Sequence, residues 1–326
     1  MPCKGGAPGV RSVPDDRIGP GTDVTSRILT RPGPFRAANH ARGSGPDHDF
    51  PPDGWDRRED DMRGNAADRP LTLFEKLLLT LRRRRRGAGF WFGFAIEVVW
   101  PFAMLLTRPS FRGGEHIPKT GGALLALNHV SFSDPVFDTA FVVSSGRIPR
   151  YLAKSELWSV PVVKWVLGGG RHIPVYRSTT RAGDAYREAV AALERGEVVA
   201  FYPEGTFTAD PAGWPMKAKN GIGRIAMVTG VPVIPVANWG TQDVLPPNGK
   251  PKLFPRKRLR IVAGPPVDLS AFEGKPRTRT HLDAATSAIM ADITALVAEL
   301  RGEPAPATAF DPGPARPGVQ GTAAAS

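Results

Sequence analysis

A histidine and an aspartate that lie five positions apart are the residues of this sequence best suited to chemistry. His129 and Asp134 belong to the segment Asn-His-Val-Ser-Phe-Ser-Asp-Pro, which directly follows the apolar run Ala123–Leu127. Side chains at this spacing would point about 140° apart on a straight helix, so these two can meet only across a turn. A neutral imidazole can accept a proton near pH 7, and a carboxylate can hold the ring in one tautomer. The pair is therefore predicted to be catalytic, with His129 as general base and Asp134 as its orienting group.

A second interpretation stays open for Asp134. The Ser-Asp-Pro sequence is typical of a helix start, with Asp134 at the N-cap and Pro135 at the first helical position. On this interpretation the aspartate only caps a helix. His129 is harder to explain in structural terms alone, because an imidazole just past an apolar strand needs a polar partner.

The elements expected around this segment place it at the carboxyl end of a strand within a sheet. From about residue 120 to 301, short apolar runs alternate with helical patterns, which is typical of an α/β domain. We predict a central mixed, mostly parallel sheet flanked by helices and preceded by an N-terminal membrane-associating helical segment. Open α/β sheets hold their sites at the carboxyl ends of strands, where His129 stands. The predicted strands are Ala123–Leu127, Arg150–Ala153, His172–Tyr176, Val198–Tyr202, Val233–Ala237 and Leu259–Ala263, with helices at Arg181–Arg195 and near Thr280–Leu300.

Composition divides the chain into four predicted regions. Residues 1–69 and 302–326 are rich in Gly and Pro and lack apolar periodicity, so both are predicted to be disordered tails. Residues 70–108 are predicted to form membrane-associating helices. Residues 109–301 are predicted to form the catalytic domain.

The region 70–108 combines an apolar face, a basic cluster and an aromatic helix. Leu71–Leu81 has its apolar residues on one helical face, and Arg82–Arg86 follows directly. Gly89–Thr107 is almost long enough to span a bilayer but contains Glu97 and Pro101. We expect an interfacial or re-entrant helix in preference to a spanning one, and a buried core helix is the other alternative. The aromatic residues that suit the headgroup region are Phe90, Trp91, Phe92, Phe94 and Trp100.

Charge and cysteine content narrow the function classes. The 43 Lys and Arg against 31 Asp and Glu give a net charge of +12, which favours an anionic partner such as nucleic acid, anionic lipid or a phosphorylated substrate. The single cysteine, Cys3, excludes intramolecular disulfides and cysteine-built metal sites. The first ten residues do not form a secretory signal. We therefore expect the catalytic domain on the cytoplasmic face of the cytoplasmic membrane, bound to anionic lipid through Arg82–Arg86 and residues 89–107, with no nucleic acid partner.

Four short blocks in a fixed order resemble those of the glycerolipid acyltransferases, typified by the 1-acyl-glycerol-3-phosphate acyltransferases. Asn128–Asp134 is similar to the NHxxxxD block of that family. Three further blocks follow within about 110 residues, and this order makes the resemblance far more specific than one motif would be. The resemblance covers roughly residues 85 to 265. The further blocks are Gly170–Arg177, Phe201–Phe207 and Val231–Asn238.

The resemblance implies roles for residues beyond the catalytic pair. Lys154 and Arg177 would bind the acceptor phosphate. Glu204, Gly205 and Thr206 would form part of the acceptor site, with Glu204 organising it and Gly205 letting the backbone approach closely.

One position departs from the family pattern. Phe207 stands where the third block normally has an arginine, so a phosphate contact expected there is missing. The other cations in or close to the blocks are Arg171, Lys217 and Lys219. Any one of these could equally be a solvated surface charge.

The implied function is an O-acyltransferase of phospholipid biosynthesis. It would move a fatty acyl group from acyl-CoA or acyl carrier protein, as co-substrate, to the sn-2 hydroxyl of 1-acyl-glycerol 3-phosphate, giving phosphatidic acid. The mechanism requires no cofactor and no metal. Other acceptors stay open, namely another lysophospholipid, glycerol 3-phosphate or a glycolipid. A different class is a noncatalytic membrane-surface protein with the same fold.

Two other enzyme classes are disfavoured by their own motifs. A serine hydrolase would need a G-x-S-x-G elbow, which is absent, although Ser131 and Ser133 lie beside the histidine. Gly221 and Gly223 imitate a dinucleotide fingerprint, but no strand is predicted before them. We interpret these glycines as a helix start.

Overall fold

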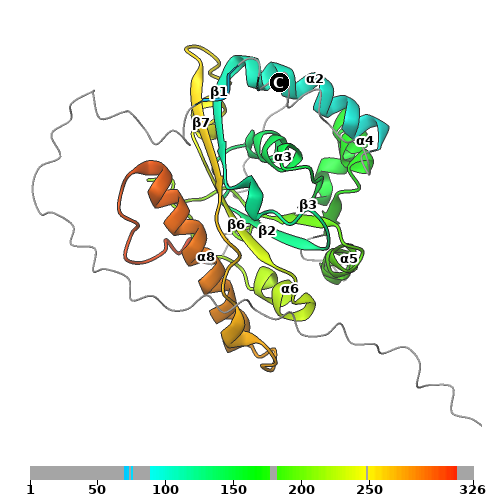
Figure 1. The fold of residues 1–326 in the computed structure, drawn as a ribbon, viewed down its shortest axis with the longest axis vertical. Coiled ribbons are helices and arrows are strands. Elements are labelled where there is room, and N and C mark those ends of the chain that lie inside the picture. Colours follow the sequence, from blue (N-terminus) through cyan, green and yellow to red (C-terminus); the bar gives the residue numbers. More distant parts are fainter. Residues whose placement is uncertain (1–69, 73–74, 76–88, 177–181, 247–248, 314–326) are drawn as a thin grey trace, which may run out of the picture. The chain divides into compact units, whose positions relative to one another are not determined.

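The computed structural model describes residues 70–72, 75, 89–176, 182–246 and 249–313 (Figure 1). All of them belong to one compact unit, Arg58–Ser326. Several predictions lie outside the described residues, namely the N-terminal tail, residues 314–326 of the C-terminal tail, the cluster Arg82–Arg86 and the proposed phosphate ligand Arg177. The same is true of most of the amphipathic helix predicted at Leu71–Leu81.

Seven strands form one sheet in the order β1-β7-β6-β2-β5-β3-β4. The five strands from β6 to β4 are parallel, whereas β7 is antiparallel to β6 and β1 runs parallel to β7. The predicted mixed, mostly parallel sheet is therefore confirmed. The strands are β1 (Thr107–Arg112), β2 (Ala123–Leu127), β3 (Pro149–Lys154), β4 (Ile173–Val175), β5 (Val198–Phe201), β6 (Val233–Trp239) and β7 (Lys257–Ala263).

The edge strand β1 has no counterpart among the sequence predictions. Its sequence, Thr-Arg-Pro-Ser-Phe-Arg, contains a proline and two arginines, which hide the alternation of a strand. Proline is tolerated at a sheet edge because only one side of the strand must donate to a neighbour. The position at the edge thus explains both the composition and the missed prediction.

Helices cover both faces of the sheet (Figure 1). The alternation within β2 shows why: Leu124 and Ala126 join a core cluster with α5, α6 and α8, whereas Leu125 and Leu127 join a second cluster with α2 and α3. All five residues of β2 are buried, as expected of a central parallel strand. The α-helices are α2 (Phe90–Leu106), α3 (Asp134–Ser144), α4 (Pro161–Gly169), α5 (Ala182–Glu194), α6 (Gly221–Thr229), α7 (Thr241–Val244) and α8 (Arg279–Arg301).

Helix α2 has one face buried in the domain and one face of exposed apolar residues. Phe92, Trp100 and Met104 lie at spacings of four or eight residues and are buried. The expectation that Phe92 and Trp100 face the headgroup region is therefore wrong, because both pack inward against the domain. Phe90 and Phe94 are exposed by 76% and 51%. Among the described residues, no helix combines the length and apolar character needed to cross a bilayer.

Helices α6 and α8 approach each other at a glycine. A Cβ atom on Gly223 would lie 2.6 Å from both the Leu282 carbonyl oxygen and Thr286 Oγ1. Backbone atoms of α8 cannot move aside cheaply at that distance. The glycines at 221 and 223 thus start a helix, as interpreted from the sequence, and Gly223 allows the close packing of α6 on α8.

Replacing Gly223 with alanine is expected to destabilise the fold. Forcing a methyl group into this contact should lower the free energy of unfolding by about 1–3 kcal/mol. Gly183→Ala is the matched control, because a Cβ there meets only the Arg187 side chain at 3.5 Å within α5. That control should gain up to about 1 kcal/mol. Denaturant unfolding of both variants measures the difference, and equal stabilities would contradict the packing argument.

Candidate active site

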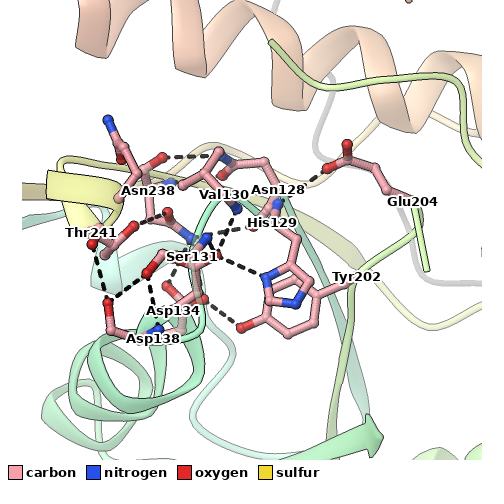
Figure 2. A network of polar contacts seen from close by, with 12 residues as sticks. Asn128, His129, Val130, Ser131, Asp134, Asp138, Tyr202, Glu204, Asn238 and Thr241 are labelled. Atoms are coloured by element: carbon pink, nitrogen blue, oxygen red, sulfur yellow. Dashed lines mark hydrogen bonds and ion pairs between the residues drawn. The ribbon is translucent and has the colours of Figure 1, made fainter. Parts of the chain in front are cut away.

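The turn between β2 and α3 brings His129 and Asp134 together (Figure 2). His129 Nδ1 lies 2.8 Å from Asp134 Oδ2. A carboxylate can only accept, so Nδ1 carries the proton and donates it to this bond. That arrangement leaves Nε2 as the ring nitrogen that can accept a proton from a substrate.

Asp134 holds the turn as well as the imidazole. The same oxygen, Oδ2, accepts hydrogen bonds from the backbone N–H groups of Val130 at 2.7 Å and Ser131 at 2.8 Å. Helix α3 begins at Asp134 with Ser133 as its N-cap, and no side-chain hydrogen bond caps it. The prediction of Asp134 as N-cap is therefore wrong by one residue. Its carboxylate binds to backbone N–H groups before the helix rather than to those of the helix.

Two aromatic rings contact the imidazole. The Tyr202 ring stacks on His129 with centroids 4.1 Å apart and an interplanar angle of 19°. Phe207 also lies against it, with centroids 4.2 Å apart, and itself contacts Phe132 at 4.3 Å. Only 15% of the His129 side chain is exposed, while Asp134 is fully buried. The position that holds an arginine in the family block thus contributes an apolar wall beside the base.

Glu204 joins the loop after β5 to the histidine. Its Oε1 accepts from the His129 N–H at 3.1 Å, and its Oε2 accepts from the Met216 N–H at 3.0 Å. Burial raises the pKa of this carboxyl to about 8, against the opposing effect of these two hydrogen bonds. Both oxygens bind to backbone, so Glu204 organises the site by holding the chain.

A pair of buried asparagines ties β2 to β6 at the same edge. The Asn238 N–H donates to Asn128 Oδ1 at 2.8 Å, and Asn128 Nδ2 donates to the Asn238 carbonyl at 3.0 Å. Thr241 Oγ1 completes the arrangement by donating to Asn238 Oδ1 at 3.2 Å. This reciprocal pair fixes the strand end from which His129 projects.

The two serines of the turn serve the backbone. Ser131 Oγ donates to the Leu245 carbonyl at 2.7 Å, and Ser133 Oγ donates to the Thr241 carbonyl at 3.2 Å. Neither hydroxyl is bonded to His129 in the part of the chain that the structure describes. Both hydroxyls instead donate to backbone carbonyls at the start and end of α7.

The predicted substrate-binding residues that the structure describes lie at or after the carboxyl ends of β3 and β5. Lys154 ends β3, is exposed, and is in register with Val175 at the end of β4, two residues before Arg177. Gly205 has φ +72°, which its turn requires, and Thr206 is exposed on the same loop.

Two of the additional cations have other partners. Arg171 forms an ion pair with Glu197 at 3.4 Å. Glu197 lies just before β5 begins, so this pair is at the amino ends of the parallel strands, away from His129. Lys217 pairs with Asp311 at 3.2 Å. Lys219 donates its backbone N–H to the Pro203 carbonyl at 3.2 Å.

The described ranges contain no group of three or more His, Cys, Asp or Glu side chains that could hold a metal ion.

Sequence reasoning missed two residues of the site, Tyr202 and Asp138. Tyr202 belongs to the third block but was not given a role, and Asp138 lies on no motif. The available signal was helical spacing, since Asp138 follows Asp134 by four residues and so shares its face of α3.

Known proteins resemble this chain over the part that carries the His129–Asp134 turn. The family model described as Acyltransferase matches residues 108–239. The chain is 26% identical over 171 residues to the 1-acyl-sn-glycerol-3-phosphate acyltransferase BAT2, chloroplastic, of Brassica napus, covering 52% of this chain and 46% of that protein. It therefore spans about half the length of this plant relative.

Bacterial relatives match over more of their length. The 1-acyl-sn-glycerol-3-phosphate acyltransferase of Pseudomonas aeruginosa is 27% identical over 239 residues, covering 71% of this chain and 86% of that protein. The fold is similar to the crystal structure of the 1-acyl-sn-glycerophosphate (LPA) acyltransferase PlsC from Thermotoga maritima, with a TM-score of 0.51 and 24% identity, covering 71% of this chain and 89% of that one. The resemblance drawn from the four sequence blocks is thereby confirmed, because the match to the Acyltransferase family model, residues 108–239, contains all four of them.

Proposed function

We propose that this chain is an O-acyltransferase that acylates the sn-2 hydroxyl of 1-acylglycerol 3-phosphate and so forms phosphatidic acid. The observation that carries the proposal is the His129–Asp134 hydrogen bond of 2.8 Å at the carboxyl end of β2, inside the family domain. The curated relatives named above, all called 1-acyl-sn-glycerol-3-phosphate acyltransferases, support this choice of acceptor.

The reaction needs one proton acceptor and no protein nucleophile. The acceptor hydroxyl oxygen attacks the thioester carbonyl carbon while its proton passes to His129 Nε2. Asp134 stabilises the imidazolium that forms. The carbon–sulfur bond then breaks, the new ester remains, and the imidazolium returns the proton to the departing thiolate. Acyl-CoA or acyl carrier protein supplies the thioester as co-substrate, and the scheme uses no cofactor and no metal.

The acceptor phosphate is assigned to the edge where β3 and β4 end. Lys154 supplies a cation there, and Arg177 follows β4 in the sequence. A second acceptor class, a lysophospholipid without a terminal phosphate, is favoured by one observation. Phe207 lies against His129 where the family block has an arginine, so this wall of the site is apolar rather than cationic.

The lipid surface is assigned to the exposed apolar residues of α2 and α4. Trp91 of α2 and Trp165 of α4 contact each other with ring centroids 4.9 Å apart, and both are almost half exposed. Apolar aromatic side chains at a surface suit the headgroup boundary. The cluster Arg82–Arg86 lies just before α2 in the sequence, separated from it by three residues, and would add attraction to anionic lipid on the cytoplasmic face.

Replacing His129 with alanine is expected to remove the general base. Membranes containing the variant should convert oleoyl-CoA and lysophosphatidate to phosphatidate about 10²–10⁴-fold more slowly than membranes containing the wild type. His281→Ala is the matched control and should leave the rate unchanged, since that imidazole lies in the first turn of α8 and binds the Pro276 carbonyl just before the helix.

The same assay tests both the base and the class of acceptor. Equal rates for His129→Ala and the wild type would overturn the assignment of the base. Wild-type activity only with a lysophospholipid that lacks a terminal phosphate would replace the proposed acceptor and attribute the change to the apolar wall at Phe207.

Stability is expected to depend on the protonation of Glu204. Its pKa is raised from 4.5 to about 8 on folding, so the folded state binds this proton more tightly than the unfolded state. The stabilisation is complete below pH 4.5 and is lost as the pH rises through about 8. The free energy of unfolding of the wild type should therefore fall relative to that of Glu204→Gln across this range. A constant difference between the two proteins would show that Glu204 keeps an ordinary pKa.

A further inference from the structure

A second buried carboxyl group, Asp138, lies one turn beyond Asp134 on α3 and takes no part in the reaction scheme. Its side chain is fully buried, and within the described ranges no ion pair reaches it. Burying a carboxyl group is costly unless hydrogen bonds satisfy it. The burial of this carboxyl group beside the site therefore needs an explanation.

The hydrogen bonds of Asp138 lead to the catalytic histidine (Figure 2). The Tyr202 hydroxyl donates to Asp138 Oδ2 at 2.7 Å, and Asn238 Nδ2 donates to both carboxyl oxygens at 3.3 Å. The ring of the same tyrosine stacks on His129 at 4.1 Å. Asp138 is thus connected to the imidazole through a single side chain.

One hydrogen bond from Nδ1 to Asp134 does not fix the imidazole completely. The ring can still turn about the direction of that bond, and this rotation moves Nε2. A flat ring stacked at an interplanar angle of 19° opposes the rotation. The tyrosine ring can do so only if it is itself held, and its hydroxyl is held by a buried residue of α3.

We propose that Asp138 and Tyr202 are a positioning pair that fixes the plane of the His129 imidazole and thereby aims Nε2 at the acceptor hydroxyl. Asp138 anchors the tyrosine hydroxyl, and the tyrosine ring constrains the base. The proposal rests on the proposed function in that His129 is taken as the base. It assigns no proton transfer to either residue of the pair.

The electrostatics of the pair agree with a geometric role. Burial raises the pKa of Asp138 well above its usual range, and the nearby Asp134 raises it further, against the hydrogen bonds from Tyr202 and Asn238, which lower it. Burial and the same two carboxyl groups also raise the pKa of the Tyr202 hydroxyl. The phenol therefore keeps its proton and donates it to Asp138, as the hydrogen bond of 2.7 Å requires.

Tyr202→Phe keeps the ring and removes its anchor. We expect kcat per folded enzyme to fall about 10- to 100-fold, because a small misplacement of a catalytic group is enough for such a loss. KM for both substrates and the pH of the acidic limb of kcat should be unchanged. Asp138→Asn should lower kcat in the same way, and the double variant should be no slower than Tyr202→Phe, since one residue acts through the other.

Tyr186→Phe is the matched control. The Tyr186 ring lies on α5 against the Arg224 guanidinium, at 4.4 Å from the ring centroid, and packs on the other core cluster. The substitution removes a tyrosine hydroxyl away from the stack on His129 and should leave kcat unchanged. Wild-type kcat in Tyr202→Phe, or losses that multiply in the double variant, would overturn the pairing. Multiplying losses are the result expected of two independent structural defects.

A spectroscopic measurement tests the pair without any activity. In histidine-labelled protein the His129 ring resonances, identified by their absence in His129→Ala, should move when Tyr202 loses its anchor and stay in place in Tyr186→Phe. Unchanged resonances in Tyr202→Phe would contradict the positioning role. If the wild type transferred no acyl group, the proposed function would fail, and this measurement would still decide whether the pair orients the imidazole.

Discussion

The candidate active site depends on one oxygen atom, Asp134 Oδ2, which accepts three hydrogen bonds. Two come from backbone N–H groups of the turn and one comes from the His129 ring. The same buried carboxylate therefore closes the turn that follows β2 and selects the tautomer of the base. Folding of the turn and orientation of the imidazole are a single event, so the reactive geometry exists wherever the turn is formed.

The strands on either side of β2 hold the turn in place. β2 lies between β6 and β5, and each neighbour contributes a contact at its carboxyl end. From β6, Asn238 exchanges backbone and side-chain hydrogen bonds with Asn128. From the loop after β5, Glu204 accepts the N–H of His129 itself. Three strands far apart in the sequence thus determine the position of one histidine, which is the preorganisation that catalysis by a fixed base requires.

Much of the fold could be predicted because each central strand is a short apolar run with clear boundaries. The bounds predicted for β2 coincide with those observed, and the helix predicted at Arg181–Arg195 is α5, Ala182–Glu194. The edge strand β1 could not be predicted in this way, since an edge position removes the need for an apolar pattern and admits Pro109.

The contact between His129 and Asp134 could be predicted from spacing and residue type, whereas its surroundings could not. Local sequence indicates that His129 and Asp134 lie on one turn. It does not indicate that Tyr202, which follows the end of β5 more than 70 positions away, stacks on the imidazole. That contact depends on the order of strands in the sheet, and a tertiary arrangement of this kind leaves no periodic signal. The roles of the substrate-binding residues stay predictions.

The junction of α2 and α4 has a consequence for how such an enzyme would meet its lipid substrate. Gly89 donates its N–H to the Gly169 carbonyl at 2.9 Å, and a Cβ on either glycine would lie only 2.7 Å from the other helix, so the two helices are joined through backbone without intervening side chains. With α2 resting in a lipid surface, as proposed, so close a junction leaves little freedom for the domain to tilt. The height of the reactive nitrogen above the hydrocarbon would then be set by the fold. The enzyme would encounter its acceptor by two-dimensional diffusion at constant depth, and the mole fraction of that lipid in the surface, rather than its bulk concentration, would govern the rate.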